Sequence, residues 1–121
     1  MKLEVLKDTF TVCKVPDYRG VDLSLPYCFL GCTDGENSLV VPASRAPENA
    51  LQREDGWKAF RIAGQLPFAL VGILAGIAAV LAEGKISIFA VSTYDTDYVF
   101  IKEENFAVAL ALLGEKGYTV C

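Results

Sequence analysis

Residues 85–102 read KISIFAVSTYDTDYVFIK and carry the clearest pattern in this chain of 121 residues. The β-branched and aromatic residues at 85–92 are typical of a strand, and residues 98–102 repeat that composition. Between them, residues 93–97 combine Thr, Tyr and Asp, which favour a turn. The stretch therefore predicts a β-hairpin, from which the other elements can be assigned in both directions.

Helices and strands alternate on both sides of this hairpin. Alternating apolar and charged residues predict a half-buried strand, and runs rich in Ala and Leu predict helices. In chain order, we expect a strand at 58–63, a helix at 70–82, the hairpin strands at 85–92 and 98–102, a helix from Glu103 or Glu104, and a strand at 118–120. The last helix should turn Phe106, Leu110 and Leu113 inward, since they recur at i, i+4 and i+7. The order βαββαβ predicts a ferredoxin-like domain of the α+β class.

The first 56 residues contain predicted strands without good helices, at 9–15, 27–32 and 38–41. Moving residues 29–41 by sixty positions places them on 89–101, strand on strand and turn on turn. Only two of these thirteen positions are identical, so the match indicates related modules without proving a duplication. We expect a degenerate, mostly β module at 1–56 and the ferredoxin-like domain at 57–121.

The composition excludes several classes of function. There is no histidine, so neither Ser-His-Asp nor Cys-His catalysis nor a His-ligated metal is expected. A net charge of −4 argues against binding a nucleic-acid backbone. The four cysteines lack CxxC spacing, which favours reduced thiols in the cytoplasm. We expect no enzyme, cofactor, metal or nucleic-acid partner.

An uncharged segment at 68–82 bears on membranes and on assembly. Its fifteen residues fall short of the about 20 that a spanning helix needs, so no membrane partner is expected. Residues 1–8 hold no uninterrupted apolar run, so no secretory signal is expected either. The helix within 68–82 is apolar or small on every side, and residues 86–91 are apolar on both faces. Such surfaces need a second cover, either the module at 1–56 or a second chain, and we expect a homodimer.

Three short runs, at 72–75, 86–89 and 92–98, resemble the ACT domain family, in the subgroup that includes the arginine-sensing CASTOR proteins. Within it, the chain is most similar to small bacterial proteins of two ACT-like modules. Residues 1–56 resemble the N-terminal module more weakly. The resemblance implies an allosteric regulatory protein that holds a small molecule, an amino acid in particular, at an interface between ACT modules.

In this subgroup, ligands are held at the start of the first helix and along the adjacent strand. Independently, free N–H groups at a helix N-terminus suit a carboxylate, and glycine at Gly72 permits close approach. Asp95 and Asp97 either hold an ammonium group or make turn hydrogen bonds, and Glu36 is either a ligand contact or a solvated turn residue. The expected ligand-binding residues are Glu36, Val71, Gly72, Ile73, Leu74, Phe89, Ala90, Val91, Ser92, Thr93, Asp95 and Asp97.

One departure from the subgroup precedes the helix. Where related sequences carry an Asp-Phe-Ser-like stretch, this chain has Pro67-Phe68-Ala69, so altered specificity or weaker binding is expected. The expected function is a small-ligand-binding regulatory protein, with an amino acid as the expected ligand. The alternative is a structural protein–protein interaction or dimerisation module that binds no ligand.

Overall fold

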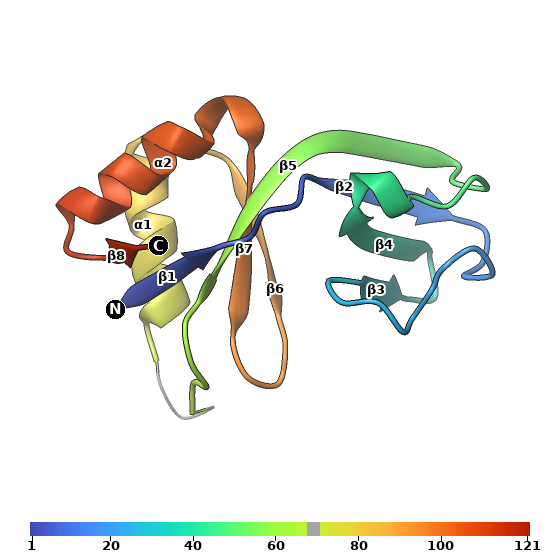
Figure 1. Ribbon diagram of the computed structural model, residues 1–121, viewed down its shortest axis with the longest axis horizontal. Helices are drawn as coiled ribbons and strands as arrows, with labels where there is room; N and C mark the ends of the chain where they lie inside the picture. The colour runs from blue at the N-terminus through green and yellow to red at the C-terminus, as the bar shows by residue number, and fades with distance from the viewer. Residues whose placement is uncertain (68–70) are drawn as a thin grey trace. The chain divides into compact units, whose positions relative to one another are not determined.

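The computed structural model describes residues 1–67 and 71–121 (Figure 1). Leu70, the predicted first residue of the helix, and Phe68-Ala69 of the expected pocket lie outside the described residues. The chain divides into two compact units. The α+β unit comprises Met1–Lys7 and Lys58–Cys121, and the β unit comprises Asp8–Trp57.

The α+β unit contains the expected βαββαβ order. Its elements are the last residues of β5 (Gln52–Ile62), α1 (Ile73–Glu83), β6 (Ile88–Ser92), β7 (Asp97–Lys102), α2 (Glu103–Glu115) and β8 (Thr119–Val120), together with β1 (Lys2–Val5). The strands lie in the order β8-β1-β5-β7-β6. Both helices lie on the same side of these strands (Figure 1). The predicted α+β, ferredoxin-like fold is therefore confirmed.

Strand β1 has no counterpart among the predicted elements. It pairs antiparallel with β5, placing Leu3 opposite Ile62, and parallel with β8, placing Leu3 opposite Val120. The compact units consequently differ from the expected ranges 1–56 and 57–121, because the first seven residues lie with the C-terminal elements. Four residues are too few to show a periodicity, and the partners of β1 are distant in sequence.

The core of the α+β unit lies between the helices and the sheet. Its buried side chains come from α1, α2 and three strands, and they include Leu3, Phe60, Ile62, Ile77, Leu81, Val99, Ile101, Phe106, Ala109 and Leu113. Phe106 and Leu113 confirm the predicted inward face of α2. Helix α1 buries Ile77 and Leu81, while Ala75, Ala79 and Ala82 are exposed. The exposed apolar residues of α1 are thus alanines. The expected packing of another surface against them remains a prediction.

The β unit confirms the three strands predicted in the first 56 residues. They are β2 (Phe10–Val15), β3 (Phe29–Cys32) and β4 (Asn37–Pro42), and a 3₁₀ turn, η1 (Ala43–Arg45), follows them. With the first residues of β5, the strand order is β3-β4-β2-β5. Cys13, Val15, Leu39 and Val41 form its buried cluster. Residues 16–28, all of which the structure describes, form no helix.

The two hairpins share one turn geometry at an offset of sixty residues. Cys32 pairs with Asn37 in β3–β4, as Ser92 pairs with Asp97 in β6–β7. The Thr33 N–H donates to the Glu36 carbonyl at 2.9 Å, and the Thr93 N–H donates to the Thr96 carbonyl at 2.8 Å. The similarity seen in the sequence therefore extends to the backbone of both turns.

Neither described helix has the length and the apolar content needed to cross a membrane.

Candidate functional site

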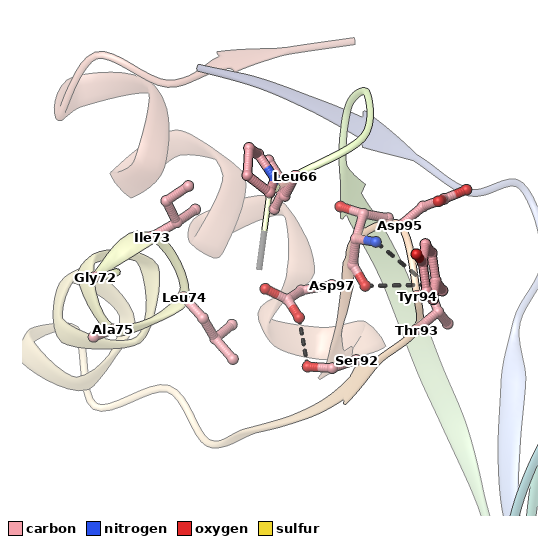
Figure 2. Close-up of a pocket in the computed structure, with 12 residues that line it drawn as sticks. Leu66, Gly72, Ile73, Leu74, Ala75, Ser92, Thr93, Tyr94, Asp95 and Asp97 are labelled. Atoms are coloured by element: carbon pink, nitrogen blue, oxygen red, sulfur yellow. Dashed lines mark hydrogen bonds between the residues drawn. The ribbon is translucent and has the colours of Figure 1, made fainter. Parts of the chain in front are cut away.

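A pocket of about 250 Å³ lies between the start of α1 and the turn that joins β6 to β7 (Figure 2). We call it the α1–turn pocket. The described residues that line it are Leu66, Pro67, Gly72, Ile73, Leu74, Ala75, Ser92, Thr93, Tyr94, Asp95, Thr96 and Asp97. The pocket thus belongs wholly to the α+β unit.

The helix side of the pocket is the beginning of α1. Gly72 is the N-cap, with a left-handed backbone (φ 84°, ψ −4°), and the first bond of the helix runs from the Gly76 N–H to the Gly72 carbonyl at 2.8 Å. The N–H groups of Ile73, Leu74 and Ala75 precede that bond and have no acceptor within a helix. Among the described residues, no side chain caps them. This end of α1 therefore offers N–H donors to an anion.

The turn side of the pocket is held by hydrogen bonds from several directions. Within the turn, the Thr93 hydroxyl donates to the Thr96 carbonyl at 3.2 Å. The buried Thr96 hydroxyl donates to the Ile62 carbonyl of β5 at 2.7 Å. The Leu66 N–H donates to the Asp95 carbonyl at 2.7 Å, which joins the segment after β5 to the turn. These hydrogen bonds hold the backbone from which the side chains of Asp95 and Asp97 extend.

The aspartates give the pocket a negative charge. Asp97 is half-buried, and its carboxylate accepts a hydrogen bond from the Ser92 hydroxyl, drawn as a dashed line in Figure 2. In that view the Asp97 carboxylate points into the space between α1 and the turn. Asp95 is exposed at the tip of the turn. Of the described residues that line the pocket, none is Lys or Arg, so nothing in its described lining neutralises these carboxylates.

Seven of the residues expected to bind a ligand come together in this pocket: Gly72, Ile73, Leu74, Ser92, Thr93, Asp95 and Asp97. Their role in binding stays a prediction. Figure 2 shows that they belong to the start of α1 and to the β6–β7 hairpin. The remainder of α1 lies between these two groups in the sequence. A helix start and a hairpin turn thus supply the two facing walls.

The other five expected residues do not line the pocket. Val71 is 88% exposed, and Phe89, Ala90 and Val91 lie further along β6, of which only the last residue, Ser92, reaches the pocket. Phe89 stacks on Phe100 with ring centroids 4.6 Å apart. Glu36 lies in the β3–β4 turn of the β unit, with its carboxylate accepting from the Ser38 hydroxyl. Whether these five residues contact a ligand stays a prediction.

Five lining residues were missed by the sequence analysis: Leu66, Pro67, Ala75, Tyr94 and Thr96. Tyr94 and Thr96 lie inside the turn motif itself, so the motif was a usable signal for them. Pro67 enters the sequence analysis only as a departure from the related sequences. Leu66 carries no sequence signal, because its place depends on its hydrogen bond to Asp95.

Two further hollows adjoin the same turn. One, of about 230 Å³, is lined by Gln65, Leu66, Pro67 and Tyr94. The other, of about 220 Å³, includes the ion pair of Arg61 and Glu4, with Nε and Oε1 3.0 Å apart. The described residues contain no group of three or more Cys, Asp or Glu side chains placed to hold a metal ion.

The half-buried thiol of Cys28 shows no sign of activation as a nucleophile. Burial raises the pKa of the Cys28 thiol, and the nearby Arg45 only partly opposes this effect. A raised pKa reduces the thiolate fraction at neutral pH, which disfavours nucleophilic chemistry.

Solved structures with the same fold come from several bacteria. A protein from Agobacterium tumefaciens shares 24% identity at a TM-score of 0.87, with 99% of this chain and 91% of that chain covered. A Vibrio cholerae protein of unknown function shares 25% identity at a TM-score of 0.73, covering 94% and 88%. The regulatory subunit of aspartate kinase from Thermus thermophilus shares 11% identity at a TM-score of 0.60, covering 89% and 92%.

None of the curated proteins compared with this sequence matches it. The ACT domain family matches residues 52–115, which is more than half of the chain and includes α1, the hairpin and α2. The chain therefore belongs to the ACT domain family.

Proposed function

We propose that this chain is a non-catalytic regulatory protein that binds a free amino acid in the α1–turn pocket. The observation that carries the proposal is the pairing of opposite polarities in one small space. N–H donors of Ile73 to Ala75 lie on one wall, and the carboxylate of Asp97 points in from the other. An amino acid, with a carboxylate and an ammonium group on one carbon, complements that pairing.

The ligand's two charged groups take different partners in this proposal. Its α-carboxylate lies at the start of α1, where the unbonded N–H groups and the helix dipole favour an anion. Its ammonium group donates to Asp97, and Asp95 adds negative potential from the tip of the turn. The serine hydroxyl of Ser92 holds the Asp97 carboxylate in place by donating to it. Each group of the ligand would thus replace its lost water with a charged or dipolar partner.

The size of the pocket is consistent with a small ligand. Its volume of about 250 Å³ lies below the ~300–1,000 Å³ typical of sites for drug-sized molecules. A nucleotide or other large cofactor would extend well beyond this space. The pocket therefore favours a molecule of amino-acid size.

The family supports the regulatory part of the proposal. The chain belongs to the ACT domain family, and one protein of the same fold is the regulatory subunit of an aspartate kinase. We further propose the two-module, CASTOR-like organisation, which is supported by the common strand order of the units: β3-β4-β2-β5 in one, and β6-β7-β5-β8 with β1 inserted before β8 in the other. In the β unit, η1 follows β4 where α2 follows β7 in the α+β unit.

We also propose that the protein acts in the cytoplasm as a homodimer, in which a second ACT module closes over the bound ligand. The exposed alanines of α1, Ala75, Ala79 and Ala82, permit close approach of another chain. The same surface is the basis of the alternative function, a dimerisation module without a ligand.

Thermal unfolding of the full chain with each of the twenty amino acids tests the proposal. A ligand at 100 times its Kd adds about 2.7 kcal/mol to the free energy of unfolding. Asp97→Asn is expected to abolish the stabilisation. Asp34→Asn, at the exposed tip of the β3–β4 turn, removes the same charge and serves as the matched control. A flat response to all twenty at millimolar concentration, together with a stable dimer in sedimentation, would favour the ligand-free alternative.

A further inference from the structure

The two ends of the α1–turn pocket differ in chemistry. The end formed by the α1 start, Ser92 and Asp97 is polar, whereas Leu66, Pro67 and Tyr94 form an apolar and aromatic wall. These same three residues, with Gln65, line the neighbouring hollow of about 230 Å³. The same apolar wall therefore borders both the pocket and the neighbouring hollow.

The apolar wall is held in place by the turn. The Leu66 N–H donates to the Asp95 carbonyl at 2.7 Å, so the segment after β5 and the tip of the turn keep a fixed spacing. Leu66 is partly buried against the core of the α+β unit. Tyr94, next to Asp95, is 74% exposed and borders both hollows. Its large aromatic ring thus borders both spaces, where an apolar group from the pocket can pack against it.

Charge is distributed unevenly along this path. The carboxylate of Asp97 lies at the polar end, while the described lining of the second hollow consists of one amide and three apolar or aromatic side chains. An anionic group extending into that hollow would find no ionic partner in its described lining. An anionic side chain would in addition be repelled by the two aspartates of the turn. An apolar side chain meets neither penalty.

We propose that the ligand is an amino acid with a large apolar side chain, aliphatic or aromatic, which extends past Leu66 and packs against Tyr94. The inference rests on the proposed function, because it assumes that the head group binds at α1 and Asp97. It adds what that function leaves open, namely how the site selects among amino acids. Selection comes from the wall after β5 and from the tip of the turn.

Calorimetric titration of the full chain with five L-amino acids tests this selection. We expect leucine or phenylalanine to bind at least tenfold more tightly than alanine, and glutamate to bind more weakly than alanine. Tighter binding of arginine or glutamate than of both leucine and phenylalanine would overturn the inference and leave the proposed function standing. Absence of binding by all five would overturn the inference, and a flat response to all twenty in thermal unfolding would overturn the proposed function as well.

Variants of Tyr94 locate the side-chain subsite. Tyr94→Ala is expected to weaken phenylalanine binding about tenfold while changing alanine binding less than twofold, and Tyr94→Phe is expected to retain tight binding of phenylalanine. Leu23→Ala removes a 68% exposed apolar side chain from the β unit and serves as the control. Because Tyr94 is exposed, its variants should unfold at the temperature of the unsubstituted protein.

The Asp97→Asn variant separates head group from side chain. This substitution is expected to weaken the binding of alanine and of phenylalanine by the same factor, because both ligands present the same ammonium group. If Tyr94→Ala weakened the binding of alanine and of phenylalanine equally, Tyr94 would contact the ligand's head group instead of its side chain. This result would contradict the inference.

Discussion

The hydroxyl of Thr96 donates a hydrogen bond of 2.7 Å to the carbonyl oxygen of Ile62 and thereby ties the β6–β7 turn to strand β5. Thr96 is buried, whereas its neighbours Thr93, Tyr94 and Asp95 are exposed. The position sixty residues earlier holds Glu36, an exposed side chain that bonds to Ser38 instead. The two turns share a backbone geometry, but the β6–β7 turn alone has a buried threonine at this position.

Replacing Thr96 tests the importance of this tether. Thr96→Val keeps the shape and removes the donor, so we expect a loss of ~1–3 kcal/mol in the free energy of unfolding, as for other buried polar groups left without a partner. Thr96→Ser keeps the hydroxyl and should lose less. Urea denaturation of both variants makes the comparison. Equal stability of the valine and serine variants would show that the hydrogen bond contributes little.

The fully buried Leu3 provides a test of strand β1. Leu3→Ala removes a side chain from the core cluster of the α+β unit and is expected to cost about 2–5 kcal/mol. Lys2→Ala, at the exposed neighbouring position, should change the stability by less than about 0.5 kcal/mol. Chemical denaturation measures both. If Leu3→Ala were as mild as Lys2→Ala, β1 would not be part of the folded sheet in solution.

Gly72 begins α1 with a left-handed backbone at φ 84°, and a Cβ added there would meet nothing within 4 Å. Gly72→Ala is therefore expected to cost about 1–2 kcal/mol through backbone conformation alone. Gly72→Asn should cost less, because asparagine tolerates this conformation better. Gly114→Ala in α2, also with an open Cβ position, is the matched control and should stabilise the protein by roughly 0.5–1 kcal/mol. Thermal unfolding of the three variants decides whether the conformation of Gly72 sets the cost.

The raised pKa of Cys28 predicts a pH dependence. Since burial favours the neutral thiol, Cys28 in the folded chain ionises above its ordinary pKa of 9.0. As the pH rises through 9.0, the unfolded thiol ionises first, so the folded state loses stability above that pH. Iodoacetamide labelling of Cys28, followed by mass spectrometry, should show a midpoint above that of the urea-unfolded chain. In Cys28→Ser, the corresponding part of the stability loss should disappear.

Much of the fold could be predicted from local patterns. The alternation of side chains and the turn residues of 93–97 located β6, β7 and the hairpin, and the spacing of Phe106 and Leu113 located the inward face of α2. These features are local because a strand or helix places its apolar residues at a period that the sequence itself displays. The same patterns located the strands of the β unit.

The candidate site could be predicted only in part. The turn motif and Gly72 placed seven of the lining residues, because a turn and a helix start leave signatures in the sequence. Phe89, Ala90 and Val91 lie outside the pocket, because only Ser92 of strand β6 reaches it, and their contact with a ligand stays a prediction. Glu36 lies in the β unit, as the sequence analysis expected, and its contact with a ligand stays a prediction.

By itself, the sequence determined the order of elements and the chemistry of the hairpin turn. Only the tertiary structure decided that β1 lies between β5 and β8, and that Leu66 and Thr96 complete the walls of the pocket. The reason is physical. Pairings such as Leu3 with Ile62 and Thr96 with Ile62 join residues far apart in the chain, so the entropy lost in closing these long loops must be offset by the packing of the whole core.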